Sequence, residues 1–286
     1  MKRVIFNQKG GVGKTSLTCN LAAAASKLGR KVLVLDLDSQ ANATQYLLGR
    51  EAKEITKSIA DFFSSTLSFK LFKDTLRECV YSTPHDNLWV IPSEGSLSEL
   101  QPKLEARYKI FKLREALDSL IESEGFTDVF FDTPPALNFY TMSALIAADR
   151  VLIPFDCDAF SADALTKVMN IIQEVASDHQ PGLESEGIII NQFQSQAKLP
   201  QEGVAALVEK GFKVLTPYLS ASIAMRESHA AHIPLVILKP KHKLSEEFMA
   251  LAASLLSLNS PADHLPGDQH EDGHVRQRDH DDPVRP

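Results

Sequence analysis

The run KGGVGKT, residues 9–15, carries the clearest chemistry in the sequence. It follows the apolar run VIFN and precedes a helical pattern that starts at Thr15. Glycines in such a place let backbone N–H groups approach an anion closely, and the amino-terminal end of the helix adds a partial positive charge. The Lys14 ammonium can reach the β- and γ-phosphates of a nucleotide, and the Thr15 hydroxyl can bind Mg²⁺. The run therefore predicts a phosphate-binding loop.

Short apolar runs alternate with helical patterns through most of the chain and would position this loop. The runs are continuous, rich in β-branched and aromatic residues and bounded by Gly, Pro or Asp, as in strands buried on both faces. We expect strands at Arg3–Asn7, Lys31–Asp36, Leu88–Pro92, Asp128–Asp132, Arg150–Phe155 and Gly187–Asn191. We expect helices at Thr15–Leu28, Leu97–Ile121, Ala159–Val175 and Leu244–Leu258. This rhythm predicts one α/β domain, a doubly wound, mostly parallel sheet with helices on both faces.

The composition fits such a domain and excludes several classes of protein. Of the 286 residues, 44% are hydrophobic and 23% are charged, which is typical of globular chains. The net charge of −7 excludes a strongly basic nucleic-acid binder at the level of the whole chain. There is no apolar run long enough for a membrane span, and the three cysteines lie far apart, which argues against a disulfide framework or a zinc cluster. We therefore expect a cytoplasmic protein.

The end of the chain differs from the rest. Residues 261–286 contain seven acidic and three basic side chains, four of the nine histidines and almost no large apolar residue. Such a segment cannot bury enough surface to offset the entropy lost on ordering. We predict a folded domain over residues 1–258 and a disordered, acidic, histidine-containing tail over residues 259–286.

Three motifs, in this order along the chain, resemble those of the ParA/MinD family of partition and positioning ATPases. KGGVGKT departs from the usual GxxxxGK[ST] pattern because residue 8 is Gln, and its second lysine is Lys9, as in the deviant Walker A motif of that family. Residues 36–44, DLDSQANAT, resemble the D-x-D-P-Q-x-N-x-T switch, with Ser39 in place of the usual Pro. Residues 132–135, DTPP, resemble the Walker B motif and second switch. The resemblance covers roughly residues 1–258 and includes Asn191, where the family has an asparagine that contacts adenine.

The resemblance implies a P-loop NTPase fold and a slow, partner-stimulated ATPase with ATP and Mg²⁺ as cofactors. Phosphoryl transfer to water depends mainly on positioning and on neutralising charge. Lys14 would neutralise phosphate oxygens within one subunit, and Lys9 would reach the nucleotide of the other subunit in a homodimer formed in the ATP state. Asp38 would face the same side as Asp36 if that strand continues, and would orient the attacking water, although the sequence leaves open whether Asp36 does so. The expected nucleotide-binding residues are Gly10, Gly11, Val12, Gly13, Lys14, Thr15, Ser16 and Asn191, and the residues expected to hold Mg²⁺, directly or through water, are Thr15, Asp36 and Asp132.

Among the outputs that such an ATPase needs, the sequence favours DNA binding. In the ParA-type resemblance, Lys198 and Arg226 lie where bases contact DNA phosphates, and the run KPKHK, residues 239–243, adds three more. We therefore expect nucleoid association through nonspecific DNA, with a ParB-like or other adaptor that stimulates hydrolysis. The cargo would be a plasmid, a chromosome region, a chemoreceptor cluster or a protein compartment such as a carboxysome, and the sequence does not choose among them.

Other outputs fit the sequence less well. Membrane binding of the MinD kind needs a basic amphipathic helix at the C-terminus, whereas this chain ends in an acidic segment. Electron transfer or iron–sulfur cluster transfer needs cysteines near the second switch or a CxxC, and the sequence has neither. The first expected strand begins at Arg3, so we expect no N-terminal helix-turn-helix. Two alternatives stay open: a nucleotide-dependent protein-binding switch without DNA affinity, and a metabolic ATP-dependent ligase of dethiobiotin-synthetase type.

Overall fold

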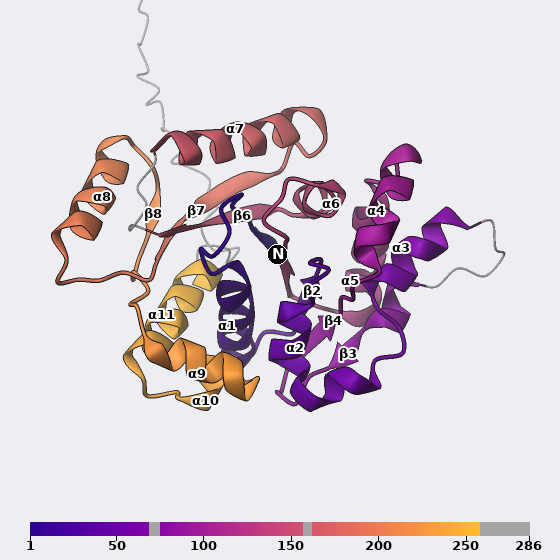
Figure 1. Cartoon of the computed structure of the whole chain (residues 1–286), viewed down its shortest axis with the longest axis horizontal. Helices are drawn as coiled ribbons and strands as arrows, with labels where there is room; N and C mark the ends of the chain where they lie inside the picture. Colours follow the sequence, from indigo (N-terminus) through magenta and orange to yellow (C-terminus); the bar gives the residue numbers. More distant parts are fainter. Residues whose placement is uncertain (69–74, 157–161, 258–286) are drawn as a thin grey trace, which may run out of the picture.

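One mixed sheet runs through the computed structural model, which describes residues 1–68, 75–156 and 162–257. Within these ranges the strand order is β3-β4-β2-β5-β1-β6-β7-β8, and all neighbours are parallel except β3 and β4 (Figure 1). The bounds are β1 Lys2–Ile5, β2 Val32–Asp36, β3 Tyr81–Ser82, β4 Leu88–Ile91, β5 Asp128–Asp132, β6 Arg150–Asp156, β7 Glu184–Asn191 and β8 Val214–Leu215. Strands β2 to β5 lie on one side of β1 in the sheet, and strands β6 to β8 lie on its other side. Ligands of such sheets bind beyond the carboxyl ends of the strands at this switch point.

Helices cover both faces of the sheet because each buried strand presents apolar side chains alternately to either side. On β2, Leu33 and Leu35 join one hydrophobic core, whereas Val32 and Val34 join the other. Helices α3 to α8 pack on the first core, and α1, α2 and α9 to α11 pack on the second (Figure 1). The bounds are α1 Lys14–Lys27, α2 Asn42–Leu48, α3 Ile59–Leu67, α4 Leu97–Ala106, α5 Lys112–Glu124, α6 Phe139–Ala147, α7 Ala162–Asp178, α8 Lys198–Glu209, α9 Ile223–Ala231, α10 Leu235–Leu238 and α11 Lys243–Ser257.

The fold class predicted from the sequence is confirmed. Each of the six expected strands is present within a few residues of its expected bounds, and the helices expected at Thr15–Leu28 and Leu244–Leu258 correspond to α1 and α11. The first three residues of the helix expected at Ala159–Val175, and the tail 259–286, lie outside the described residues. The edge strands β3 and β8 are missing from the prediction, because a strand of two residues leaves no recognisable pattern. Within the described ranges, no helix is long and apolar enough to cross a membrane.

The single helix expected at Leu97–Ile121 is wrong, because the chain forms two helices there, α4 and α5. At the break, the N–H of Lys109 donates to the carbonyl of Leu104 at 3.2 Å, and Tyr108 adopts a φ of 52°. A left-handed residue of this kind ends a helix and satisfies its last carbonyls. Gly is the usual residue at such a position. Because Tyr stands there instead, the sequence does not mark the end of the helix.

A buried charge network fastens α11 to the amino ends of the strands. Arg3, in β1, is fully buried and donates to the Glu186 carboxylate from Nε at 2.8 Å and from Nη2 at 3.2 Å. It also donates to Asp128 at 2.9 Å and to the carbonyl of Leu255 at 3.0 Å. Removing one partner of a buried pair costs about 3–5 kcal/mol, so these contacts hold the end of the sheet opposite the phosphate-binding loop.

Candidate nucleotide-binding site

The run KGGVGKT forms the loop between β1 and α1. Gly11 and Gly13 adopt φ of 77° and 87°, in the left-handed region that glycine reaches without strain. A Cβ atom added to Gly10 or Gly11 would meet nothing within 4 Å, so the backbone borders open space there. Backbone N–H groups around such a space, ahead of a helix, form a cradle for phosphate oxygens.

Lys14, the first residue of α1, brings a buried cation to this cradle. Its exposed fraction is 8%, and within the described part of the chain its Nζ makes one hydrogen bond, to the carbonyl of Lys9 at 3.3 Å. Burial lowers the pKa of Lys14, and the carboxylates of Asp132 and Asp38 oppose that shift. An ammonium has three donors, so this group retains the capacity to bind phosphate oxygens.

Two buried carboxylates end neighbouring strands beside the loop. Asp36 of β2 and Asp132 of β5 are register partners, and both are fully buried. The Thr15 hydroxyl donates to Oδ2 of Asp132 at 2.8 Å. Burial raises the pKa of Asp132 well above its usual range, and the nearby charge of Asp36 raises it further. A hydroxyl and a carboxylate are the oxygen ligands that Mg²⁺ prefers, and the ion would relieve the cost of burying this charge.

The carboxylate of Asp36 is held by the segment that follows it. It accepts hydrogen bonds from the N–H of Asp38 at 3.1 Å and from the N–H and hydroxyl of Thr44 at 2.8 and 2.7 Å. Burial still raises the pKa of Asp36 to about 6, because it outweighs these three bonds. The contacts show that Asp36 folds the turn of residues 36–44; its expected part in holding Mg²⁺ through water stays a prediction.

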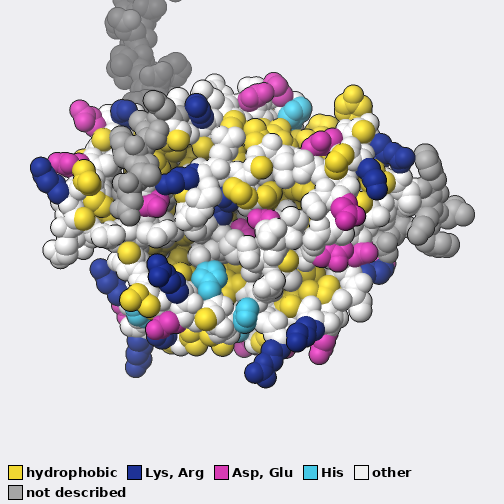
Figure 2. Space-filling model, in the orientation of Figure 1, with side chains coloured by type: hydrophobic (Ala, Val, Ile, Leu, Met, Phe, Trp, Pro, Cys, Tyr) yellow, Lys and Arg dark blue, Asp and Glu magenta, His cyan; other side chains and the backbone are white. Residues whose placement is uncertain are grey.

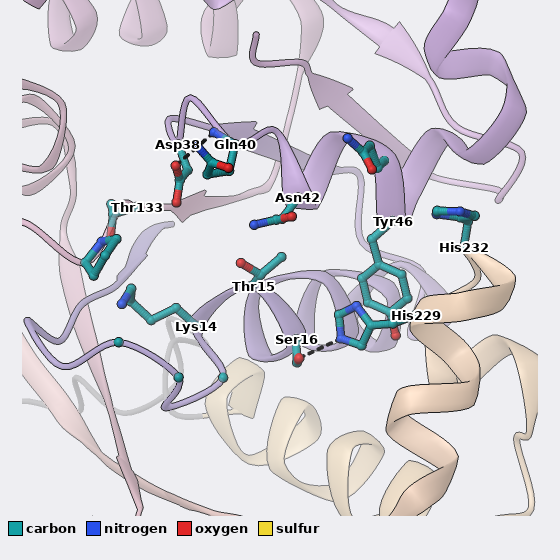
Figure 3. Close-up of a pocket in the computed structure, with 15 residues that line it drawn as sticks. Lys14, Thr15, Ser16, Asp38, Gln40, Asn42, Tyr46, Thr133, His229 and His232 are labelled. Carbon is teal, nitrogen blue, oxygen red and sulfur yellow. Dashed lines mark hydrogen bonds between the residues drawn. The ribbon is translucent and has the colours of Figure 1, made fainter. Parts of the chain in front are cut away.

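A cavity of about 550 Å³, the phosphate cavity, opens over the loop (Figure 3). Asp38, Gln40 and Asn42 line it from the segment after β2, and Thr133 and Pro135 line it from the segment after β5. The same cavity is lined by Gly10, Gly11, Gly13, Lys14, Thr15, Ser16, Gln45, Tyr46, His229 and His232. Figure 3 shows Lys14 below and Asp38 and Gln40 above the space between them.

A second cavity of about 440 Å³, the side cavity, adjoins the phosphate cavity. Its lining combines the loop, the end of β7 and the start of α9: Gly11, Gly13, Ser16, Asn191, Gln192, Ser220, Ala221, Ser222, Ile223, Met225, Arg226, His229 and Leu244. Asn191 donates from Nδ2 to the carbonyl of Val12 at 2.9 Å, which ties β7 to the loop. Because its lining combines polar groups with the apolar side chains of Ile223 and Met225, this cavity suits a purine base.

The chain is similar in sequence to known proteins. A family model described as an AAA domain matches residues 2–185. The chromosome partitioning protein ParA of Myxococcus xanthus is 30% identical over 263 residues, which cover 90% of this chain and 88% of that protein. The chain belongs to the ParA/MinD family of ATPases.

Solved structures of other ParA/MinD-family proteins have the same fold. McdA of Cyanothece superposes with a TM-score of 0.76 at 25% identity, covering 89% of this chain and 98% of that one. The septum site-determining protein MinD of Pyrococcus horikoshii, in complex with Mg-ADP, has a TM-score of 0.68 at 23% identity, covering 90% of this chain and 96% of that one. A McdA–ATP complex is also known, so the nucleotides and magnesium of these neighbours agree with the cofactors predicted here, ATP and Mg²⁺.

In this ParA/MinD-family chain, the phosphate cavity and the side cavity together form a nucleotide cleft. The predicted phosphate-site residues that line the phosphate cavity are Gly10, Gly11, Gly13, Lys14, Thr15, Ser16 and Asp38. Lys9 has an exposed side chain at the start of the loop, and its N–H donates to Oδ1 of Asn7 at 2.9 Å. Asp38 lines the phosphate cavity from a turn, because β2 ends at Asp36 and the strand does not continue to Asp38. The side chain of Val12 is buried and lines neither cavity, so its predicted contact with a nucleotide would come from its backbone.

The two residues predicted to bind DNA lie on different helices. Lys198 begins α8; its side chain is 87% exposed and pairs with Glu202 at 3.2 Å. Arg226 is exposed on α9 and lines the side cavity. Arg226 is therefore placed to meet a nucleotide as well as a partner at the surface, and its role in DNA binding stays a prediction.

Tyr46 and His229 are site residues that the sequence reasoning missed. Tyr46 follows the residue 36–44 motif by two positions, and His229 lies in α9, far along the chain. Their rings stack with centroids 4.1 Å apart and an interplanar angle of 16°. No local motif marks either residue, because the folding of α9 against α1 and α2 creates the contact.

Proposed function

We propose that this chain is a nucleotide-switched ATPase that positions or segregates a cellular cargo on nonspecific DNA. In the cytoplasm it would bind ATP with Mg²⁺, form a homodimer and associate with the nucleoid. A ParB-like or other adaptor would stimulate hydrolysis and release. The cargo class stays open among a plasmid, a chromosome region, a chemoreceptor cluster and a protein compartment.

The observation that carries this proposal is that two switch segments line one phosphate cavity. Asp38 and Gln40 face it from the segment after β2, and Thr133 and Pro135 face it from the segment after β5. A terminal phosphate in this cavity would contact both segments, and its loss on hydrolysis would release both. This arrangement favours a conformational switch over a metabolic ligase.

Different residues around the phosphate cavity would supply different parts of the hydrolysis chemistry. Lys14 would neutralise phosphate oxygens, and Thr15 with Asp132 would hold Mg²⁺, which supplies charge neutralisation when bound. Asp38 would orient the attacking water, since its carboxylate lies at the cavity and its Oδ1 already accepts the N–H of Gln40 at 3.0 Å. Asp36 would act through the turn that carries Asp38.

Lys9 is the candidate for contact between subunits. Its side chain is exposed next to Gly10, which lines the phosphate cavity, and its carbonyl accepts a hydrogen bond from Lys14. A compact ammonium on a flexible stem suits reach across an interface. We expect Lys9→Ala to bind ATP as the wild type does but to dimerise at least tenfold more weakly, measured by analytical ultracentrifugation with an ATP analogue. Equal dimerisation of both proteins would remove Lys9 from the interface.

The proposed DNA surface lies where the loops entering α8, α9 and α11 meet. Residues 194–196, 220–222 and 242–244 line one hollow there. Lys243 lines this hollow, and Lys198 and Arg226 lie in the first turns of the helices that follow the first two segments. Figure 2 shows Lys and Arg side chains along the edge where α8, α9 and α11 lie, interspersed with Asp and Glu. The exposed pair Lys198–Glu202 contributes little, about 0–1 kcal/mol, so a DNA phosphate can replace Glu202.

The test is binding to random-sequence duplex DNA at two salt concentrations, with an ATP analogue, with ADP and without nucleotide. We expect binding only with the ATP analogue and a marked loss at the higher salt concentration. Arg226→Glu and Lys198→Glu should weaken binding uniformly across sequences and reduce the salt dependence. Lys112→Glu is the matched control, because Lys112 is also an exposed helical lysine, paired with Glu115, on α5.

Each outcome of this test has a consequence for the proposal. An unchanged affinity in Arg226→Glu and Lys198→Glu would move the DNA surface elsewhere on the molecule. No DNA binding in any nucleotide state would favour the alternative of a protein-binding switch without DNA affinity.

A further inference from the structure

His229 lies where the phosphate cavity and the side cavity meet. Four residues line both cavities: Gly11, Gly13, Ser16 and His229. The other described lining residues each line only one of the two cavities. The phosphate cavity contains Lys14 and Asp38, and the side cavity contains Asn191. A nucleotide with its phosphates in the first and its base in the second would place its sugar and α-phosphate at this junction.

The imidazole of His229 is held there by contacts from two other helices. Its Nε2 lies 2.8 Å from the hydroxyl of Ser16 in α1, and its ring stacks on Tyr46 in α2. The Tyr46 hydroxyl is itself fixed, by Ser228 at 2.7 Å and by Nδ2 of Asn20 at 3.1 Å. Figure 3 shows the His229 ring between Ser16 and Tyr46.

The chemistry of the junction suits the oxygens of a sugar and a phosphate. A neutral imidazole offers one donor and one acceptor, and the Ser16 hydroxyl offers both. Figure 2 shows histidine side chains at the surface where α1, α2 and α9 meet, so an incoming ligand can reach them.

We propose that His229 is a positioning residue for the sugar of the bound nucleotide, with Tyr46 fixing the plane of its ring. When the nucleotide enters, its oxygens become hydrogen-bond partners of His229 and Ser16, which bond to each other in the structure described. This inference depends on nucleotide binding and is independent of DNA, cargo and adaptor.

The stacked pair also links the two elements that the proposed switch must couple. Tyr46 belongs to α2, directly after the segment that contains Asp38, and His229 belongs to α9, which also contains Arg226. Occupancy of the junction therefore fixes α9 relative to the first switch segment. The same two rings serve nucleotide affinity and the position of α9.

Calorimetric titration with ATP, ADP and inorganic tripolyphosphate, each with Mg²⁺, tests the proposal. His229→Ala should weaken the binding of ATP and of ADP by the same factor, about tenfold, because both contain the sugar. Its affinity for tripolyphosphate, which lacks the sugar, should change by less than about twofold. Equal weakening of tripolyphosphate would assign His229 to the structure of the phosphate loop, and an unchanged affinity for ATP would exclude the contact; either result overturns the proposal.

His179→Ala is the matched control, since His179 is also a partly buried histidine whose ring packs on an aromatic ring, that of Phe111. It lines neither the phosphate cavity nor the side cavity. Its affinity for all three ligands should match that of the wild type. Where His229→Ala is too unstable for titration, His229→Gln, which keeps polar atoms but loses the stacked ring, gives the same comparison between ATP and tripolyphosphate.

Discussion

The two ends of the nucleotide cleft are built in different ways. The phosphate end consists mostly of consecutive residues, 9–16, whose backbone forms the cradle, together with carboxylates at the ends of β2 and β5. The side cavity consists of side chains from β7, α9 and the start of α11, joined only in the folded chain. Backbone chemistry is set by a short run of residue types, whereas side-chain chemistry at the other end depends on how distant elements pack.

The two ends also differ in their charge. At the phosphate end, burial lowers the pKa of Lys14 and raises that of Asp36 to about 6, so both charges are held at a cost. At the junction with the side cavity, burial lowers the pKa of His229, and the nearby His232 lowers it further. The phosphate end is therefore arranged for ions, whereas burial favours the neutral form of His229 at the junction.

Lys14→Ala should have the largest effect, because it removes the buried cation of the phosphate end. We expect the affinity for ATP to fall at least about 100-fold, a loss of about 2.7 kcal/mol or more. Calorimetric titration with ATP and tripolyphosphate should give the same loss for both ligands, in contrast to His229→Ala. Tight ATP binding in Lys14→Ala would refute the assignment of the phosphate-binding loop.

Asp38→Asn should separate binding from hydrolysis at the same end. We expect ATP to bind within a few-fold of the wild-type affinity and hydrolysis to slow by about 100-fold, the low end of the range for a lost general base. Single-turnover hydrolysis and a separate binding titration measure the two effects. Normal turnover would show that another acidic residue orients the attacking water, and Asp36 would be the next candidate.

Gly13→Ala tests the point where the two ends touch. The added Cβ would lie 2.4 Å from Nδ2 of Asn191, at a residue with a φ of 87°. We expect unfolding in urea to show a loss of about 1–3 kcal/mol, in part from backbone strain. In an Asn191→Ala background the loss should be smaller, because the side-chain clash is absent and only the strain remains. Equal losses in both backgrounds would show that Asn191 moves aside freely.

The smallest expected effect is a pH dependence from His229. Its pKa is lowered on folding, so the unfolded chain protonates first as the pH falls below about 6.5, the ordinary value. The contribution of neutral His229 to stability is fully present above that value and is lost as the pH falls through its folded pKa. Because the group is partly exposed, the effect should be under about 1 kcal/mol.

Urea unfolding between pH 7.5 and 5.5 measures this contribution. The loss of stability on acidification should be smaller in His229→Gln than in the wild type. His232 on the same helix and Tyr46 on α2 are the titratable groups nearest the ring, and His232→Asn controls for the former. An identical pH dependence in His229→Gln would show that His229 makes no such contribution.

The sequence by itself determined the phosphate end and the core of the sheet. The glycines, Lys14 and the following helix act through backbone geometry within a few residues, and a continuous apolar run can be read as a buried strand without knowing its neighbours. Asp36 and Asp132 each end an expected strand and are expected to hold Mg²⁺, and the structure makes them register partners.

Only the tertiary structure decided the rest. The break at Tyr108 depends on packing, since no Gly or Pro stands in the turn between α4 and α5. The motif of residues 36–44 contains Asp36, Asp38 and Thr44, but it does not give the three hydrogen bonds that hold Asp36. The stack of Tyr46 on His229 joins residues whose patterns give no sign of each other. Such contacts depend on the distance and angle between whole elements, which side-chain packing fixes across the fold and no local run of residues encodes.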